Sequence, residues 1–195
     1  MHNIAKFFFP ILLLLFAVVV AAQNEKNNAR DTQRLWLDSE IGHQGDYQWK
    51  MIKAGDAADP GEKISLSNYA TANWMPAIVP GTVLNSLVYN KKYPEPYYGI
   101  NNKIESKLIP DISETGRDFY TYWFRTDFTV PQSFKGKTVW LQLDGINYRA
   151  EIWVNGNLLS TMNGMFIQDY IDVTDFVKVG ESNGLAIKVY PVDVP

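Results

Sequence analysis

Apolar and polar residues alternate with a period of two through the second half of the chain. This period predicts β-strands, because successive side chains of a strand point to opposite faces of its sheet. The alternation is clearest in four segments, which are Asp118–Val130, Lys137–Leu143, Tyr148–Val154 and Gly184–Tyr190. A shorter strand is expected at Tyr170–Val173, followed by a turn over Thr174–Lys178.

The same alternation assigns side chains to the two faces of each strand. Between residues 137 and 154, the side chains expected to face the core are Val139, Leu141, Leu143, Ala150, Ile152 and Val154. Trp140 and Gln142 are expected on the outer side of their strand. Glu151 and Trp153 are expected on the outer side of the next one.

The strongest turn signal lies within the stretch Leu143–Phe166. One strand ends at Leu143, and the chain turns at Gly145-Ile146-Asn147. Asn155-Gly156 then separates two apolar runs, and this pair favours a type I′ hairpin because both residues tolerate a positive φ. The stretch therefore predicts antiparallel pairing.

The first half of the chain gives weaker signals. Asp46–Ala54 alternates well enough for one strand. Trp74–Gly81 contains two prolines, which remove ladder donors, so an extended segment at a sheet edge is expected there. Thr82 is expected to cap a short helix over Val83–Tyr89. Short strands without a long amphipathic helix predict an all-β fold, an antiparallel β-sandwich of the jelly-roll type.

The N-terminal segment lies outside this β pattern. Residues 1–22 combine a short start containing Lys6, an apolar run of about 14 residues and a small-residue end at Ala21-Ala22. This order predicts a secretory signal peptide. An uncleaved anchor is the alternative, although a membrane-spanning helix needs about 20 apolar residues. Residues 23–33 are expected to form a flexible tail, and residues 34–195 a β-sandwich domain truncated at its C-terminal end.

Charge and cysteine content exclude several kinds of partner. The net charge is −3, and without a basic stripe neither nucleic acid nor an anionic membrane surface is an expected partner. The chain has no cysteine, so the fold depends on packing rather than on disulfides. With the signal peptide and the absence of Asn-x-Ser/Thr acceptors, this predicts an exported bacterial protein, periplasmic or extracellular, with no membrane association after cleavage.

The sequence offers no recognisable catalytic constellation. His43 is the only histidine after the signal peptide, which excludes an ordinary zinc site. Nucleophile-elbow and phosphate-loop motifs do not occur. Asp172 and Asp175 are weak candidates for a structural calcium, which needs six or more oxygen ligands. No metal or other cofactor is expected.

Two places are candidates for binding a sugar. The irregular segment Tyr93–Asp111 is too long for an ordinary connection. Tyr93, Tyr97 and Tyr98 are expected to form a stiff aromatic wall, with Pro94 and Pro96 holding the backbone. The alternative is that this loop only caps one end of the fold or contacts another domain. Glu151 and Trp153 form the second candidate, since the indole ring of a tryptophan stacks on sugars while a carboxylate binds hydroxyls. The alternative is that this pair contacts a neighbouring domain or a second sheet.

Several short motifs occur in an order that resembles a known family. The first set comprises Leu143-Asp144-Gly145-Ile146, Ala150, Ile152, Val154-Asn155-Gly156, Gly164-Met165-Phe166, Asp172-Val173-Thr174 and the strand starting at Asn183. The second comprises Asn73-Trp74, residues 79–83, Pro96-Tyr97-Tyr98-Gly99, Pro110-Asp111-Ile112 and Tyr120 to Phe124. Together they resemble the N-terminal, galactose-binding-like jelly-roll domain of glycoside hydrolase family 2. The second set is similar to the branch of exo-β-glucosaminidases and mannosylglycoprotein endo-β-mannosidases.

This resemblance implies an accessory domain of an exported glycosidase that acts on β-glucosaminides or β-mannosides. In that family the catalytic glutamates lie in a later TIM barrel, beyond an immunoglobulin-like domain, so no catalytic residue is assigned here. Two alternatives remain: a free-standing carbohydrate-binding module, and a purely structural domain that packs against other domains.

Overall fold

The structure is a computed structural model that describes residues 34–43 and 45–192. The predicted signal peptide, residues 1–22, and the predicted tail, residues 23–33, lie outside the described residues and stay predictions. From Leu37 onward the chain forms one compact unit. Within the described residues, no helix is both long and apolar enough to cross a membrane.

The strands follow the alternating segments, and the helices are short. The strands are β1 (Lys50–Lys53), β2 (Met75–Pro76), β3 (Tyr122–Thr129), β4 (Trp140–Leu143), β5 (Arg149–Val154), β6 (Asn157–Asn163), β7 (Asp169–Asp172) and β8 (Ser182–Tyr190). The α-helices are α2 (Glu40–His43), α3 (Gly61–Ile64), α4 (Val83–Tyr89) and α5 (Ile112–Thr115). Turns of 3-10 helix cover Ala54–Asp56, Ile104–Ser106, Arg117–Tyr120 and Gln132–Phe134.

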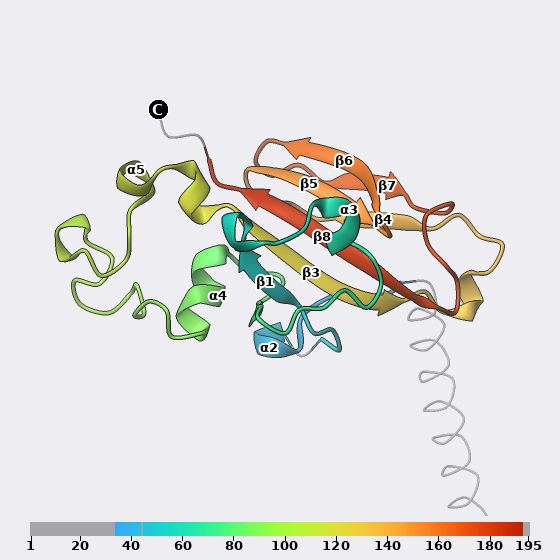
Figure 1. Cartoon of the computed structure of the whole chain (residues 1–195), viewed down its shortest axis with the longest axis horizontal. Coiled ribbons are helices and arrows are strands. Elements are labelled where there is room, and N and C mark those ends of the chain that lie inside the picture. The colour runs from blue at the N-terminus through green and yellow to red at the C-terminus, as the bar shows by residue number, and fades with distance from the viewer. Residues whose placement is uncertain (1–33, 44, 193–195) are drawn as a thin grey trace, which may run out of the picture. The chain divides into compact units, whose positions relative to one another are not determined.

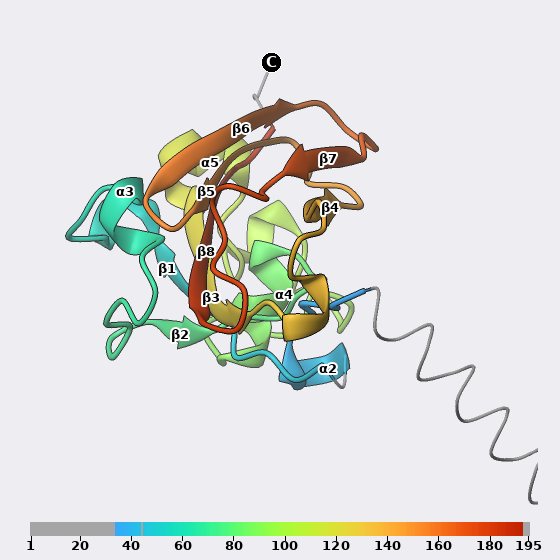
Figure 2. The ribbon, with the colours of Figure 1, turned by 90° about the vertical axis from the view of Figure 1, so that its right-hand side faces the viewer.

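The strands pair into two antiparallel sheets of unequal size. Among the described residues, six strands form the larger sheet in the order β2-β1-β3-β8-β5-β6, and β4 pairs with β7 in the smaller sheet. The smaller sheet and α4 lie on the same side of the larger sheet, whereas α3 lies on the opposite side (Figure 2). The prediction of an all-β antiparallel sandwich is confirmed, with α4 completing its second layer.

One face of the larger sheet forms the core between the layers. Its side chains include Met51, Phe124, Ile152, Val154 and Leu185, and all are buried. Ile171 of the smaller sheet is also buried, as are Val139 and Val173, which pair through a backbone hydrogen bond next to its end. The inward assignments of Val139, Ala150, Ile152 and Val154 are therefore confirmed, since burying such aliphatic side chains is the main gain on folding.

The other face of the larger sheet is covered as well. Ile52, Trp123, Trp153 and Ala186 form a second buried cluster beneath Ile64 and Trp74, which belong to the segment of residues 57–74. Arg125 fixes this segment: its guanidinium is buried and donates to the carbonyls of Ile64 at 3.1 Å and of Leu66 at 2.7 Å. The larger sheet therefore has a core on each side.

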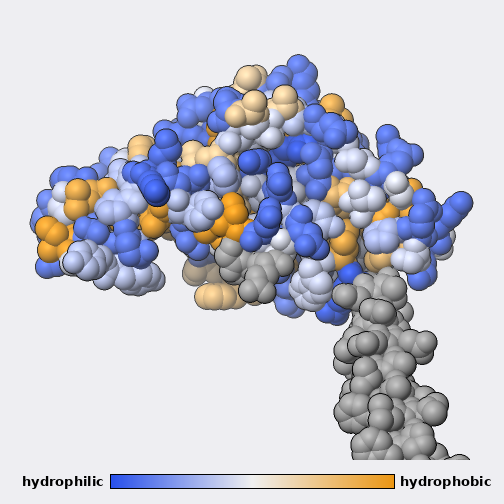
Figure 3. Space-filling model, turned by 90° about the horizontal axis from the view of Figure 1, so that it is seen from below, coloured by the Kyte–Doolittle hydropathy of each residue, from blue (hydrophilic) through white to orange (hydrophobic). Residues whose placement is uncertain are grey.

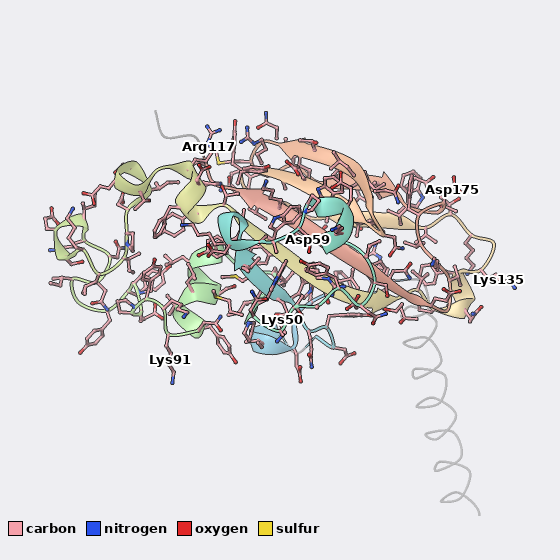
Figure 4. The ribbon with its side chains drawn as sticks, in the orientation of Figure 1. Lys50, Asp59, Lys91, Arg117, Lys135 and Asp175 are labelled. Carbon is pink, nitrogen blue, oxygen red and sulfur yellow. The ribbon has the colours of Figure 1, made fainter. Side chains whose placement is uncertain are left out.

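Asp59 gives the covering segment a polar outer edge beside α3 (Figure 4). Its carboxylate accepts from Lys63 Nζ at 3.0 Å and from the hydroxyl of Tyr69 at 3.1 Å. These two hydrogen bonds hold the pKa of Asp59 below its usual range. The polar edge thus ties α3 to the loop on either side of it.

Several local predictions are confirmed in detail. Thr82 caps α4, its hydroxyl accepting from the backbone N–H of Asn85 at 2.9 Å. The short β2 lies at an edge of the larger sheet, as the prolines of its segment require. Asn155 and Gly156 have φ of 46° and 89°, as the predicted turn between β5 and β6 requires.

Three predicted strands are clearly shorter in the structure. The strand expected at Lys137–Leu143 is limited to β4, Trp140–Leu143. The strand expected at Asp118–Val130 begins only at Tyr122, because the chain first makes a 3-10 turn over Arg117–Tyr120. The strand expected at Asp46–Ala54 is limited to β1. The turn after Leu143 does not join paired neighbours; it carries the chain from the smaller sheet to the larger one.

Candidate functional site

The long irregular segment of the sequence is an excursion from the sandwich, here defined as residues 93–111. It leaves the fold after α4 and returns through α5 to β3, and it lies at the end of the larger sheet where β3 begins and β8 ends (Figure 1). Its only regular element among the described residues is the 3-10 turn Ile104–Ser106. The excursion is therefore a loop presented by a rigid sheet, which is how many binding residues are placed.

Hydrogen bonds within the excursion give it a defined path. The carbonyl of Glu95 accepts from the backbone N–H of Tyr98 at 3.2 Å and from Asn101 Nδ2 at 2.9 Å. The Ser106 hydroxyl donates to the carbonyl of Lys103 at 2.7 Å. Lys107 pairs with Glu114 of α5 at 2.5 Å, which connects the excursion to the following helix. The excursion is thus folded on itself.

The base of the excursion is anchored by a tyrosine. The Tyr120 hydroxyl donates to the carbonyl of Pro110 at 2.5 Å. Burial, together with neighbouring Tyr93, Tyr122 and Asp111, raises the pKa of Tyr120 to about 12. The hydroxyl therefore keeps its proton at physiological pH and holds the returning chain against β3.

The tip of the excursion exposes the two predicted tyrosines. Tyr97 is 92% exposed and Tyr98 is 78% exposed. Ile100, Ile104 and Leu108 are also exposed, and apolar surface is visible over the excursion at the left of Figure 3. Exposed apolar groups gathered on one loop are typical of an interaction site. The substrate-binding role assigned to Tyr97 and Tyr98 stays a prediction.

The side chain of Trp153 is buried, whereas the sequence predicted an exposed one. The prediction of an open outer face at Trp153 is wrong, because the segment of residues 57–74 covers that face and leaves the side chain 9% exposed. The sequence pattern assigned Trp153 to the correct face of β5 but did not predict the segment that covers this face. A substrate-binding role for Glu151 and Trp153 stays a prediction.

The carboxylate of Glu151 has a partner at each oxygen. Oε1 accepts from the Tyr190 hydroxyl at 2.5 Å, and Oε2 accepts from Trp153 Nε1 at 3.2 Å. Burial and the bond to Glu151 raise the pKa of Tyr190. Arg149 lies over the Tyr190 ring, with its guanidinium carbon 4.5 Å from the ring centroid. This arrangement fastens the end of β8 to β5.

The four predicted residues thus do not form one site. Tyr97 and Tyr98 lie at the tip of the excursion, whereas Glu151 and Trp153 lie on β5. Sequence reasoning missed Tyr190 and Arg149, which stand opposite each other on paired strands. The alternation of the last strand was visible, but its pairing with β5 could not be read from local pattern.

The described residues offer no arrangement suited to a metal ion. Among them, no group of three or more His, Cys, Asp or Glu side chains could hold one. Asp172 instead accepts at Oδ1 from the backbone N–H of Thr174 at 3.0 Å and from its hydroxyl at 2.6 Å. These bonds lower the pKa of Asp172 and form a local turn. The calcium candidate therefore has no supporting geometry among these residues.

The described residues thus form a two-layer β-sandwich with a helical side cover and an aromatic loop at one end. A family model described as "Glycosyl hydrolase 2 galactose-binding domain-like" matches residues 49–193. The chain belongs to this family, and the resemblance inferred from its motifs is confirmed.

Curated relatives place this domain within much longer proteins. The chain is 42% identical over 125 residues to a mannosylglycoprotein endo-beta-mannosidase of Lilium longiflorum, covering 64% of this chain and 13% of that protein. It is 28% identical over 146 residues to an exo-beta-D-glucosaminidase of Amycolatopsis orientalis, covering 73% of this chain and 13% of that protein. The chain therefore spans about an eighth of the length of these relatives.

A solved structure agrees with both the fold and the family. The crystal structure of the Amycolatopsis orientalis exo-chitosanase matches with a TM-score of 0.62 and 27% sequence identity. The match covers 76% of this chain and 16% of that one. The sandwich described above is thus similar to one part of a larger glycosidase.

Proposed function

We propose that this chain is the N-terminal accessory β-sandwich domain of a longer exported glycosidase that hydrolyses β-glucosaminides or β-mannosides. The family match over residues 49–193 carries this proposal. The relatives named a β-mannosidase and a β-glucosaminidase support the two substrate classes. Carbohydrate is the partner of the parent enzyme, and the remaining domains of the same parent, including an immunoglobulin-like domain and a TIM barrel, are the partners of this one.

The chemistry of the parent needs two carboxylates, and we assign neither of them to this domain. In retaining glycosidases, one carboxylate attacks the sugar and the other protonates the leaving group. Glu151 bonds to Tyr190 and Trp153, and Asp172 forms a local turn. The family resemblance implies that both catalytic carboxylates lie in the later barrel of the parent. The role of this domain is to pack on the catalytic domain and to shape the approach of the substrate.

The excursion is the part of the domain that faces the substrate. Its tip carries Tyr97 and Tyr98, whose rings are exposed, on a loop that is tied to itself and to α5. A tyrosine ring offers an apolar face to a sugar and a hydroxyl for hydrogen bonding, with little conformational entropy to lose. Such a loop contributes binding rather than bond cleavage.

Kinetics of the full-length parent enzyme test this role. The double variant Tyr97→Ala/Tyr98→Ala should raise KM about tenfold and leave kcat nearly unchanged, since lost uniform binding affects KM alone. Tyr89→Ala is the matched control, because Tyr89 is 50% exposed but lies on α4. If the double variant melts at the wild-type temperature and its KM is unchanged, the excursion does not contact the substrate.

Export is part of the proposal and has its own test. The order of charged, apolar and small residues over residues 1–22 supports cleavage after Ala22. Mass spectrometry of the protein secreted or released from the periplasm should give a chain that begins at Gln23. A protein that keeps residues 1–22 and stays with the membrane fraction would contradict cleavage.

A further inference from the structure

The outer face of the smaller sheet carries two exposed aromatic rings. Trp140 on β4 is 56% exposed, and Tyr170 on β7 is 55% exposed. In the register of the two strands, Trp140 lies opposite Asp172 and Gln142 lies opposite Tyr170. The two rings are therefore diagonal neighbours on one face, a spacing that aromatic side chains can bridge.

The rest of this face is polar. Alternate residues along both strands and their extensions are exposed, which are Thr138, Trp140, Gln142, Asp144, Gln168, Tyr170, Asp172 and Thr174. We call these eight residues the β4–β7 face. Gln142 Nε2 donates to Asp144 Oδ1 at 2.6 Å, and Gln168 Nε2 donates to the same oxygen at 3.4 Å. Side-chain amides from both strands thus converge on one carboxylate.

Both charged residues of the β4–β7 face are acidic. Asp144 and Asp172 lie towards opposite ends of the paired strands; Trp140 is opposite Asp172, and Tyr170 lies in the row between the two carboxylates. The hydrogen bonds from Thr174 favour the ionised form of Asp172, so this end of the face is negative at neutral pH. The face therefore suits a partner that carries positive charge.

Packing of the sandwich does not require these rings. The inner side of the smaller sheet is provided by Leu141 and Leu143, which are partly buried, and by Ile171, which is buried. Two large rings that remain in water do not gain the stabilisation that burial would give. A pair of exposed rings on one face therefore indicates an interaction surface, whereas a single exposed ring does not. A binding partner that covers the two rings would account for their exposure.

We propose that the β4–β7 face binds an oligosaccharide of β-linked amino sugars. The apolar faces of successive sugar rings stack on Trp140 and Tyr170, and the hydroxyl groups bond to the amides of Gln142 and Gln168. The protonated amines pair with Asp144 and Asp172. An ammonium group beside an indole ring is further stabilised by the ring quadrupole. The choice of β-linked amino sugars rests on the proposed function, whereas the site itself does not depend on the role of Tyr97 and Tyr98.

A sugar fits this face better than a protein does. Centres of protein interfaces are depleted in aspartate, and a stable interface buries about 1,600 Å² in total. Here the two rings stand among two carboxylates and two amides on only two short strands. On this face, rings that can stack lie next to amides and carboxylates that can form hydrogen bonds. A sugar chain likewise repeats apolar ring faces and edges that carry hydroxyl groups.

Titration of the 195-residue chain with β-1,4-linked glucosamine pentamer tests the proposal. Binding should be saturable, should shift the tryptophan fluorescence and should weaken as salt is added. Trp140→Ala and Tyr170→Ala should each weaken binding about tenfold, the scale of one lost stacking contact. Tyr89→Ala is the control for Tyr170→Ala, since its ring is 50% exposed. Asp172→Asn keeps the shape, removes the charge and should also weaken binding.

Four results would overturn the proposal. The first is no binding of the pentamer by the wild-type chain. The second is unchanged binding by both ring variants, with folding verified by circular dichroism. The third is equal affinity for the N-acetylated pentamer, which would remove the assigned role of the amines. The fourth is that Trp140→Ala destabilises the full-length parent without affecting sugar binding, which would make the face an interdomain contact.

Discussion

The ring of Trp153 lies against the backbone of Gly61. A Cβ atom at Gly61 would lie 2.5 Å from Trp153 Cε2 and 2.7 Å from Cδ2. Gly61 begins α3, and Trp153 lies on β5. The absence of a side chain at one residue therefore lets the covering segment come close enough to bury the ring of the other.

Replacing Gly61 should destabilise the fold by overpacking. We expect Gly61→Ala to lower the free energy of unfolding by about 2 kcal/mol, because an indole held in a packed cluster has little room to move. Urea unfolding followed by tryptophan fluorescence measures this. Gly55→Ala is the control, since within the described structure nothing lies within 4 Å of its added Cβ. Equal unfolding midpoints for the two variants would contradict the close contact.

Arg125 should contribute strongly to the stability of the fold. Its guanidinium is 3% exposed and bonds to the carbonyls of Ile64 and Leu66 and to both oxygens of Asp127. We expect Arg125→Met to cost about 3 kcal/mol, because the carbonyl of the buried Ile64 loses its donor and Asp127 loses its charged partner. Lys50→Met, at the paired position of β1, should change stability by less than about 0.5 kcal/mol. Thermal melts of both variants measure the difference.

Asn155 and Asn183 should be energetically coupled. Asn155 Nδ2 donates to Asn183 Oδ1 at 2.7 Å, and the buried Asn183 also bonds to the backbone of Lys178 and Glu181. A double-mutant cycle with alanine at both positions should give a coupling free energy of about 1 kcal/mol. Additive effects of the two single variants would show that each asparagine acts only on its own turn.

Stability should fall at alkaline pH. Burial raises the pKa of Tyr120 to about 12, above its ordinary value of 10.0, so the folded state favours the protonated phenol. This contribution is complete below pH 10 and is lost as the pH rises from about 10 towards 12. Unfolding midpoints measured from pH 9 to 11.5 should therefore fall less steeply for Tyr120→Phe than for the wild type. The same slope in both proteins would contradict the assignment.

Much of the fold follows from local pattern, because strand alternation and turn chemistry act between near neighbours. The hairpin at Asn155-Gly156, the cap at Thr82 and the edge segment with two prolines are such features. Trp153 shows the limit: alternation placed it on the face opposite Ile152, but the chain that covers that face comes about ninety residues earlier. Only long-range packing determines which face is open.

Candidate binding residues could be predicted where they depend on local sequence, but not where they depend on strand pairing. Tyr97 and Tyr98 were identified because an aromatic, proline-rich loop is unusual in itself. The hydrogen bond between Tyr190 and Glu151 depends on the register of two strands that are distant in sequence. Trp140 was assigned to an outer side, yet its nearness to Tyr170 follows only from the pairing of β4 with β7.

The central position of β8 has a consequence for how the protein is made. β8 joins β3 to β5, and it is synthesised after every other strand of the larger sheet. Until residues 182–190 leave the ribosome, β2-β1-β3 and β5-β6 are two separate pieces with unpaired edges. Unpaired edges promote association between chains, so the growing domain is exposed to aggregation or chaperone capture until β8 emerges.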